Sequence, residues 1–228
     1  MSEAGPRSEN QDTWGVQWLS DLSLLACIAD GVGGTRHGGT ASNRAVADFM
    51  RGMAGDPRQD LRELLRTVHA ALRTESTSNG GDFGATTFTA AVIRDGTLTG
   101  VHVGDTRLLL VRGGKVRQLT TDHTEVARLV RDGQLTKVAA AEYPRRHILE
   151  AALGAGLLPE MQAFECRLWP GDKLVFTTDG AHNKIAKREI REFATSIERA
   201  FPFVSRIAER VRKRRPDDNF TVIVVSIQ

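Results

Sequence analysis

Apolar and polar residues alternate with a period of two between positions 84 and 120, which predicts a run of consecutive strands. The glycine turns in "DGT" and "RGGK" separate these strands and suit antiparallel hairpins. Other apolar runs predict further strands before and after this region. The predicted strands cover 22–30, 84–93, 98–105, 107–114, 115–120, 162–169, 173–179 and 219–227.

Elsewhere the apolar residues recur at spacings of three and four, which is typical of helices that bury one face. The segment 60–77 shows this best, because its leucines and its valine form one stripe opposite a charged face. The predicted helices cover 41–53, 60–77, 125–133, 187–195 and 203–215. Hairpin-linked strands interrupted by helices, without regular alternation, favour an α+β fold with an antiparallel sheet core flanked by helices.

The composition indicates one globular domain over residues 1–228, since 40% of the residues are hydrophobic and no low-complexity linker divides them. The formal net charge is +3 and both signs are mixed along most of the chain, so no nucleic-acid partner is expected. The basic residues within 206–215 are interpreted as a solvated helix face. Cys27 and Cys166 are expected to be reduced thiols. Without a signal sequence or a membrane-spanning run, a cytoplasmic location and no membrane contact are expected.

Isolated aspartates occur in five short motifs, and four of them adjoin an apolar strand. They are Asp12 in "ENQD", Asp30 in "IADG", Asp105 in "VGDTR", Asp179 in "TTDG" and Asp218 in "PDDNFT". Carboxylates gathered at one rim of a sheet repel one another and lose hydration, so a cation is expected to neutralise them. Ligation by oxygen alone favours magnesium or manganese. Taken singly, each aspartate could equally belong to a turn.

Five glycines follow Asp30 within nine residues. A loop with so few side chains can bring main-chain carbonyls and amides against a metal ion or its waters, and it leaves room for a phosphate. Arg7 lies five residues before Asp12 and offers a planar fork that matches phosphate oxygens. These residues together indicate a metal-dependent phosphoester hydrolase, while a purely structural role for them stays open.

The order and wording of these motifs resemble the metal-dependent serine/threonine phosphatases of the protein phosphatase 2C family, especially its compact bacterial members. The matching segments are "RSENQD", "ADGVGG", "GATTFTAAVI", "VHVGDTRLLLVRGGKVRQLTTDHT", "LVRDGQLTKVAAAEYPRRHILEAALG", "LVFTTDGAHN" and "DDNFTVIVV". They span nearly the whole chain in the family's order. The resemblance implies a four-layer α-β-β-α sandwich, in which two antiparallel sheets pack face to face with helices outside. A flap at about 122–148 is expected to govern substrate choice.

The resemblance also implies the metal ligands. Asp30 is expected to bridge two manganese or magnesium ions. Asp179 and Asp218 would complete the first ion, and the Gly31 carbonyl would contribute to the second. Asp105 falls where bacterial members hold a weaker third ion.

Two further residues are assigned roles in the reaction by the same resemblance. Arg7 would bind the substrate phosphate, and Asp12 would orient metal-bound water. A hydroxide shared by the two ions would attack phosphoserine or phosphothreonine directly, without a phosphoenzyme. The implied partners are phosphorylated proteins, together with a cognate Ser/Thr kinase whose action the enzyme reverses, and a monomer is expected.

Several positions depart from the family pattern. Gln11 stands where glutamate is frequent, which predicts weaker binding of the second metal, and Asn183 stands where an acidic residue is sometimes found near the third. Val32 replaces a histidine that some members use near the leaving group, so the general acid is unassigned. His182 is a candidate for it, although a solvated surface histidine is the simpler interpretation. Only six residues precede Arg7, so the family's edge strand there is expected to be missing unless the true start lies upstream.

Two other functions stay open on this sequence. A catalytically inactive phosphoprotein-binding module would have lost a metal aspartate, yet all of them are present. A phosphatase acting on a small-molecule phosphoester would keep them, and a preference for nucleotides over phosphopeptides would identify it.

Overall fold

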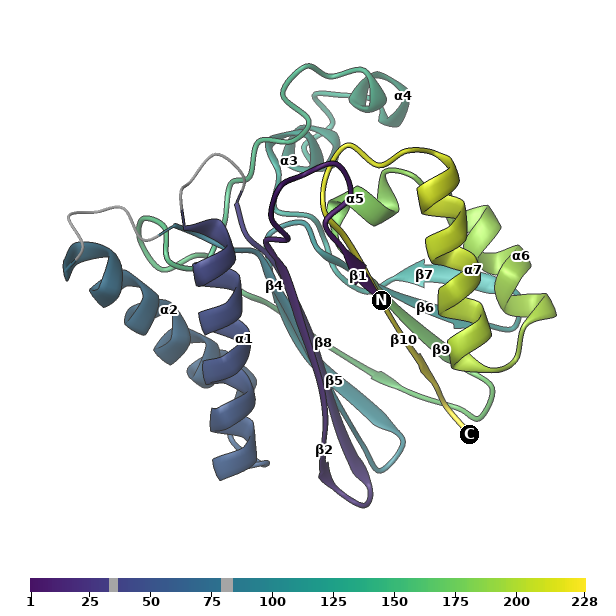
Figure 1. Ribbon diagram of the computed structural model, residues 1–228, viewed down its shortest axis with the longest axis horizontal. Coiled ribbons are helices and arrows are strands. Elements are labelled where there is room, and N and C mark those ends of the chain that lie inside the picture. Colours follow the sequence, from purple (N-terminus) through teal and green to yellow (C-terminus); the bar gives the residue numbers. More distant parts are fainter. Residues whose placement is uncertain (33–36, 79–83) are drawn as a thin grey trace.

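The computed structural model describes residues 1–32, 37–78 and 84–228. Within these ranges the strands form two five-stranded sheets that pack face to face, and helices cover both outer surfaces (Figure 1). This arrangement confirms the expected four-layer sandwich of the α+β class.

Both sheets are antiparallel at every pair of neighbouring strands. The first sheet contains, in spatial order, β2 (Asp12–Ser20), β3 (Ser23–Asp30), β4 (Phe88–Arg94), β5 (Thr97–Val103) and β8 (Gln162–Arg167). The second sheet contains β1 (Ser2–Glu3), β10 (Phe220–Ser226), β9 (Lys173–Thr177), β6 (Arg107–Arg112) and β7 (Lys115–Gln118). The two predicted hairpin turns are confirmed, since they join β4 to β5 in the first sheet and β6 to β7 in the second. Strands β2 to β5 are neighbours in chain order, with α1 and α2 between β3 and β4, whereas the second sheet gathers strands from both ends of the chain.

Two pairs of helices complete the outer layers. Helices α1 (Gly38–Gly55) and α2 (Leu61–Ser78) cover the first sheet, while α6 (Lys187–Ser196) and α7 (Ala200–Lys213) cover the second (Figure 1). The short helices α3 (Glu125–Arg131) and α4 (Lys137–Ala141) belong to the segment expected to form the flap, and α5 (Asp179–His182) follows β9 directly.

Three apolar layers hold the sandwich together, one under each helix pair and one between the sheets. Phe49 of α1 and Phe88 of β4 represent the first, with ring centroids 4.9 Å apart. Leu108 and Phe176 of the second sheet pack on Ile28 of the first to form the middle layer. Because β3 and β4 are covered on both faces, their residues are apolar at nearly every position.

The strand boundaries show what the sequence pattern missed. The nine-residue strand β2 was not predicted. Its apolar residues Trp14, Val16 and Trp18 are exposed and alternate with other residues, so the strand lacks the continuous buried apolar run of its neighbour β3. An edge strand is present before Arg7 as the two-residue β1, which pairs with β10 through Ser2 and Thr221. Of the two alternatives that the sequence left open, a missing edge strand is therefore wrong.

The basic residues within 206–215 are mostly neutralised. Five of them pair with Glu209, Glu189 or Glu3. Arg206 and residues 212–215 are also exposed, which agrees with the predicted solvated helix face. Among the described residues, no helix combines the length and the apolar character that crossing a bilayer requires.

The backbone of α5 at Gly180 lies very close to the backbone of Asn219, just before β10. A Cβ added at Gly180 would lie 2.0 Å from the carbonyl oxygen of Asn219, and that backbone cannot move without shifting β10. Gly180→Ala is therefore expected to lower the free energy of unfolding by about 1–3 kcal/mol. Urea unfolding in the presence of chelator measures this.

The matched control is Gly55→Ala at the end of α1, where an added Cβ meets no atom within 4 Å. It should be neutral or slightly stabilising, since alanine favours helix over glycine. Equal losses in the two variants would contradict the contact at Gly180.

Candidate active site

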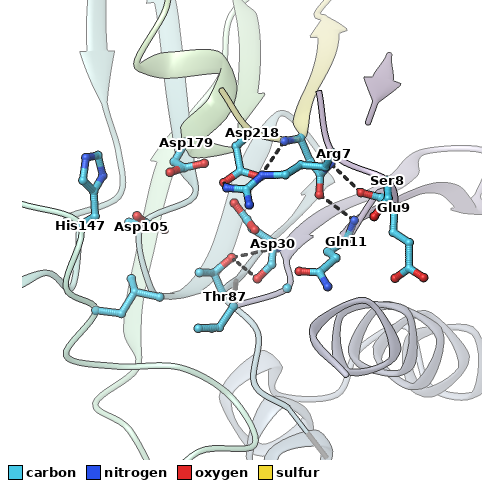
Figure 2. Close-up of a pocket in the computed structure, with 14 residues that line it drawn as sticks. Arg7, Ser8, Glu9, Gln11, Asp30, Thr87, Asp105, His147, Asp179 and Asp218 are labelled. Carbon is cyan, nitrogen blue, oxygen red and sulfur yellow. Dashed lines mark hydrogen bonds and ion pairs between the residues drawn. The ribbon is translucent and has the colours of Figure 1, made fainter. Parts of the chain in front are cut away.

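A pocket of about 300 Å³ lies where the strand ends of both sheets meet (Figure 2). Its walls include six of the seven residues predicted from the sequence to form the site. These are Arg7, Asp30, Gly31, Asp105, Asp179 and Asp218. The seventh, Asp12, is buried next to the pocket and interacts electrostatically with three of its aspartates. Residues up to 211 positions apart in sequence therefore lie in one site.

Asp30 is the last residue of β3, and both its N–H and its carbonyl are bonded to Thr86 and Thr87. Its N–H donates to Thr87 Oγ1 at 2.9 Å, and its carbonyl accepts from the Thr87 N–H at 2.9 Å and from the Thr86 hydroxyl at 2.9 Å. These bonds leave the carboxyl group of Asp30 free to point into the pocket. Burial, followed by repulsion from Asp12, raises the pKa of Asp30 well above its ordinary value.

The surroundings of Gly31 show why a glycine directly follows Asp30. A Cβ at this position would lie 2.4 Å from the carbonyl group of Gly38, at the start of α1. Only glycine allows this close approach of two backbones, which brings the N-terminus of α1 beside the pocket. The rest of the predicted loop, residues 33–36, lies outside the described residues.

Asp12 connects the two sheets. It begins β2 in the first sheet, and its Oδ2 accepts hydrogen bonds from the hydroxyls of Thr178 and Thr221 in the second, each at 2.8 Å. Its Oδ1 is buried without a hydrogen-bond partner. Burial raises the pKa of Asp12 to about 7, and repulsion from Asp179 and Asp218 adds to this effect. An unpaired carboxylate oxygen in such surroundings fits a site built for positively charged neighbours.

Asp218 and Asp179 flank the neighbouring strands β10 and β9 of the second sheet. The Arg7 guanidinium donates from Nη2 to Asp218 Oδ2 at 2.7 Å, and Figure 2 shows it beside Asp218 and above Asp30. Asp179 opens α5, and its pKa is raised by burial first and by Asp218 second. Arg7 thus supplies the positive charge that partly offsets these carboxylates.

Asn219 holds the segment that carries Arg7. Its Nδ2 donates to the carbonyls of Ala4 and Glu9, each at 2.8 Å, and its Oδ1 accepts from the Gln11 N–H at 2.8 Å. Sequence reasoning assigned no role to this residue, although it directly follows Asp218. A buried asparagine that satisfies three main-chain groups fixes where Arg7 can reach.

Asp105 lies at the turn between β5 and β6, and a polar network supports that turn. Burial raises the pKa of Asp105 to about 7, with Asp179 and Asp122 adding to the shift. The Gly104 N–H donates to His123 Nδ1 at 3.1 Å. The buried His102 bonds Thr89 Oγ1 at 2.8 Å through Nδ1 and the Thr121 carbonyl at 3.1 Å through Nε2. The start of the predicted flap is therefore anchored to the turn that presents Asp105.

The chemistry of these groups favours a hard cation. Asp12, Asp30, Asp105 and Asp179 have raised pKa values because they are buried beside one another. Among the described residues no salt bridge reaches any of these four, and Arg7 pairs only with the neighbouring Asp218. Within residues 1–32, 37–78 and 84–228, no three acidic, histidine or cysteine side chains are placed so that they alone could hold one ion. A bound ion would therefore need main-chain oxygen or water as well, which Mg²⁺ and Mn²⁺ accept readily.

Other pocket residues were missed by sequence reasoning. His147 lines the pocket from the predicted flap, and Glu9 lines it from the segment of Arg7 (Figure 2). Leu149, the next residue but one, lies just beyond the predicted flap and also lines the pocket. No local motif marks His147, because only the folding of the flap brings it beside Asp105. The pocket is therefore richer in titratable groups than the aspartate motifs indicated.

His182, considered from the sequence as a proton donor, is not a lining residue of this pocket. It is half-buried in α5 and contacts Thr177 Oγ1 through Nδ1 at 3.4 Å. Its pKa is well below the ordinary value because burial disfavours the imidazolium. The interpretation of His182 as a solvated surface histidine was therefore wrong, and a low pKa makes it a poor acid at neutral pH.

Comparison with known proteins identifies one family. Residues 5–221 match the model of the family described as protein phosphatase 2C. The chain is similar to the serine/threonine phosphatase stp of Listeria monocytogenes, with 31% identity over 96% of this chain and 90% of that protein.

Solved structures agree with this match. The serine/threonine phosphatase of S. agalactiae superposes with a TM-score of 0.92 at 28% identity, covering 100% of this chain and 98% of that one. The catalytic domain of the serine threonine protein phosphatase PstP, solved with two manganese ions, superposes with a TM-score of 0.83 at 26% identity, covering 100% of this chain and 96% of that one.

Burial of Asp12 predicts a pH-dependent stability. Its folded-state pKa of about 7 exceeds the unfolded value, so the folded protein retains a proton that the unfolded chain releases. Stability of the metal-free protein therefore falls as pH rises from about 4 to about 7. Asp12→Asn cannot ionise, so it should be more stable than the wild type by about 1–3 kcal/mol at pH 8 and nearly equal at pH 4.

Urea unfolding in chelator at the two pH values measures this difference. Asp21→Asn, which replaces an exposed carboxylate in the β2–β3 hairpin, is the control and should show no such gain. An equal gain from Asp12→Asn at both pH values would rule out the buried charge as its cause.

Proposed function

The chain belongs to the protein phosphatase 2C family, and on this premise we propose that it removes phosphate from phosphoserine and phosphothreonine with the help of two divalent ions. Family membership makes it a metal-dependent serine/threonine phosphatase. The observation that carries the proposed mechanism is the convergence of Asp30, Asp179 and Asp218 in one pocket, next to the unpaired buried oxygen of Asp12.

The carboxylates of Asp30, Asp179 and Asp218 and the carbonyl of Gly31 are the proposed ligands of these two ions. When bound, two such ions supply a nucleophilic hydroxide near neutral pH and offset charge on the phosphoryl oxygens. Asp12 is not proposed as a ligand and would contact the site beside these residues. Its Oδ2 is already held by two threonine hydroxyls, so its Oδ1 is directed to orient water or hold a proton.

Arg7 is proposed to bind the phosphate. Its guanidinium is exposed and lies at the pocket, and its charge is paired with Asp218. A phosphate group would offer the same fork a bidentate partner of higher charge. The exchange of Asp218 for phosphate would deliver substrate and release a ligand carboxylate in one movement of this side chain.

Substrate choice is proposed to lie in the flap at 122–148. His147 of the flap and Leu149 just beyond it line the pocket and would contact the residues that flank the phosphorylated side chain. Asp105, at the base of the flap, is proposed to hold a weaker third ion, as expected from the family pattern. Its pKa of about 7 suits a group that needs a cation nearby to ionise at lower pH.

The proposed physiological substrates are proteins phosphorylated by a cognate Ser/Thr kinase, in the cytoplasm, with residues 1–228 acting as one catalytic domain. An inactive binding module is disfavoured, because no predicted metal carboxylate is missing from the pocket. A small-molecule phosphoester as the true substrate is tested by comparing phosphothreonine peptides with nucleotides.

Activity should depend on the metal and on Asp218. Hydrolysis of p-nitrophenyl phosphate and of a phosphothreonine peptide should rise saturably as manganese is titrated from chelator upward. Asp218→Asn should lower kcat/KM by about 100-fold or more, since a ligand carboxylate is lost. The measurement is steady-state kinetics with both substrates at each metal concentration.

Asp217→Asn is the matched control, because the adjacent Asp217 is exposed and pairs with Lys184 outside the pocket. It should keep nearly wild-type kinetics. Full activity in chelator, or equal losses in the two variants, would contradict the proposed ligand set. No turnover by a folded wild type that binds manganese would support the binding module instead.

Removing Arg7 should affect phosphate and metal in opposite directions. Arg7→Ala is expected to raise the KM for p-nitrophenyl phosphate about tenfold, because the bidentate partner is lost. It should also tighten manganese binding a few-fold, since Asp218 no longer pairs with the guanidinium. Calorimetric manganese titration without substrate measures the second effect. Weaker binding of both metal and phosphate would show that Arg7 only maintains the local fold.

A further inference from the structure

Strand β2 carries an exposed apolar stripe on an open sheet edge. Trp14, Val16 and Trp18 expose 46%, 41% and 66% of their surface, although they alternate along a regular strand. They lie on the face that is turned toward the second sheet, since they pair with Ile28, Ala26 and Leu24 of β3. Figure 1 shows β2, in dark purple, at the front of the molecule. Two tryptophans on a water-exposed edge indicate a surface that is covered in the working protein.

The free hydrogen-bonding groups of this edge belong to the same residues. The Gly31 N–H donates to the Gln11 carbonyl, so the odd-numbered residues of β2 face β3. The Asp30 carbonyl accepts from Thr87 on the opposite side, which agrees with this alternation. The N–H and C=O groups of Trp14, Val16 and Trp18 therefore point away from the sheet. Within residues 1–32, 37–78 and 84–228, no hydrogen bond outside the β3 ladder reaches the backbone of Trp14, Val16 or Trp18.

The edge also lacks the features that keep exposed strands from pairing. Residues 13–20 contain no charged side chain and no proline, and the register shift beside β3 comes only after Trp18. Exposed edges normally carry lysine, proline or a bulge in their middle. The other exposed apolar residues, such as Phe201 and Leu157, lie on a helix and a loop, where no open strand accompanies them.

We propose that β2 pairs antiparallel with β2 of a second copy of this chain, about a twofold axis at Val16. The segment "TWGVQWL" is nearly symmetric about this residue. The pairing places Val16 opposite Val16, and Trp14 opposite Trp18 of the second copy. All three are residues whose N–H and C=O point outward, so these groups meet partners in this register. The two first sheets become one continuous sheet with both apolar stripes on the same face.

The area of the contact fits a dimer of moderate affinity. The exposed parts of Trp14, Val16 and Trp18 amount to about 350 Å² per copy, or about 700 Å² in a symmetric pair. The other residues of β2 bring the total to about 1,000 Å², the lower end for specific interfaces. Interfaces of this size class are often weak, so the dimer is sought at micromolar concentrations of the chain. The proposed dimer differs from the monomer expected from the sequence.

Sedimentation equilibrium of the full chain at about 1–200 µM tests the proposal. The wild type should move from monomer to dimer across this range. Val16→Lys places two like charges opposite each other and should raise the dissociation constant at least tenfold, while hydrolysis of p-nitrophenyl phosphate stays unchanged. Phe201→Lys is the matched control, because it places the same charge at an exposed apolar residue of α7, away from β2, and should leave the dimer intact.

A cysteine placed at the proposed axis tests the register directly. In a Cys166→Ser background, Val16→Cys should form a disulfide-linked dimer under mild oxidation, because opposing Cα atoms in such a pair lie about 5.5 Å apart. Thr40→Cys, at an exposed position on α1, should not form such a dimer. A wild type that stays monomeric at the highest concentration would overturn the proposal. A dimer that neither Val16 substitution affects would overturn it as well, and would place the contact elsewhere.

Discussion

Burying several carboxyl groups beside one another is costly, and the site at the edge of the sandwich depends on how that cost is met. Asp12, Asp30, Asp105 and Asp179 all have raised pKa values, and burial is the first cause in each. Repulsion alone would push these strand ends apart. Two devices oppose it in this chain, the threonine hydroxyls that bond Asp12 and the guanidinium that pairs with Asp218. A divalent ion would complete the compensation, which explains why such a site and a metal-dependent reaction belong together.

The four-layer sandwich holds these carboxyl groups in a fixed arrangement. Asp30 ends a strand of the first sheet, while Asp179 and Asp218 flank strands of the second, and the apolar layer between the sheets fixes their separation. Asp12 crosses this boundary through Thr178 and Thr221. The glycines contribute at two points, where Gly31 admits the start of α1 and Gly180 admits the backbone of Asn219. Catalytic groups held by strands and by close backbone contacts keep their geometry without help from the substrate.

The strand that begins with Asp12 links the site to the surface of the molecule. Its odd-numbered residues bond β3, and its even-numbered residues carry both the outward backbone groups and the exposed tryptophans. Pairing at this edge would add a second rigid neighbour to the strand that positions Asp12. Strand β2 therefore carries Asp12 beside the pocket at its first residue and the exposed apolar residues further along.

Much of this protein could be predicted from the sequence by itself. The apolar periods located most of the strands and helices. The aspartate and arginine motifs, with the family resemblance, predicted seven site residues, and all seven lie in or beside the pocket. These signals are local, because a strand end followed by Asp-Gly or a helical apolar stripe is encoded within a few residues. What only the tertiary structure decided depends on contacts distant in sequence. Asn219 holds the Arg7 segment, His147 lines the pocket from the flap, and His182 does not line the pocket. The edge strand β2 is a further case, since its exposed apolar residues give a weak burial pattern, and only its place at the margin of a sheet shows which backbone groups are free.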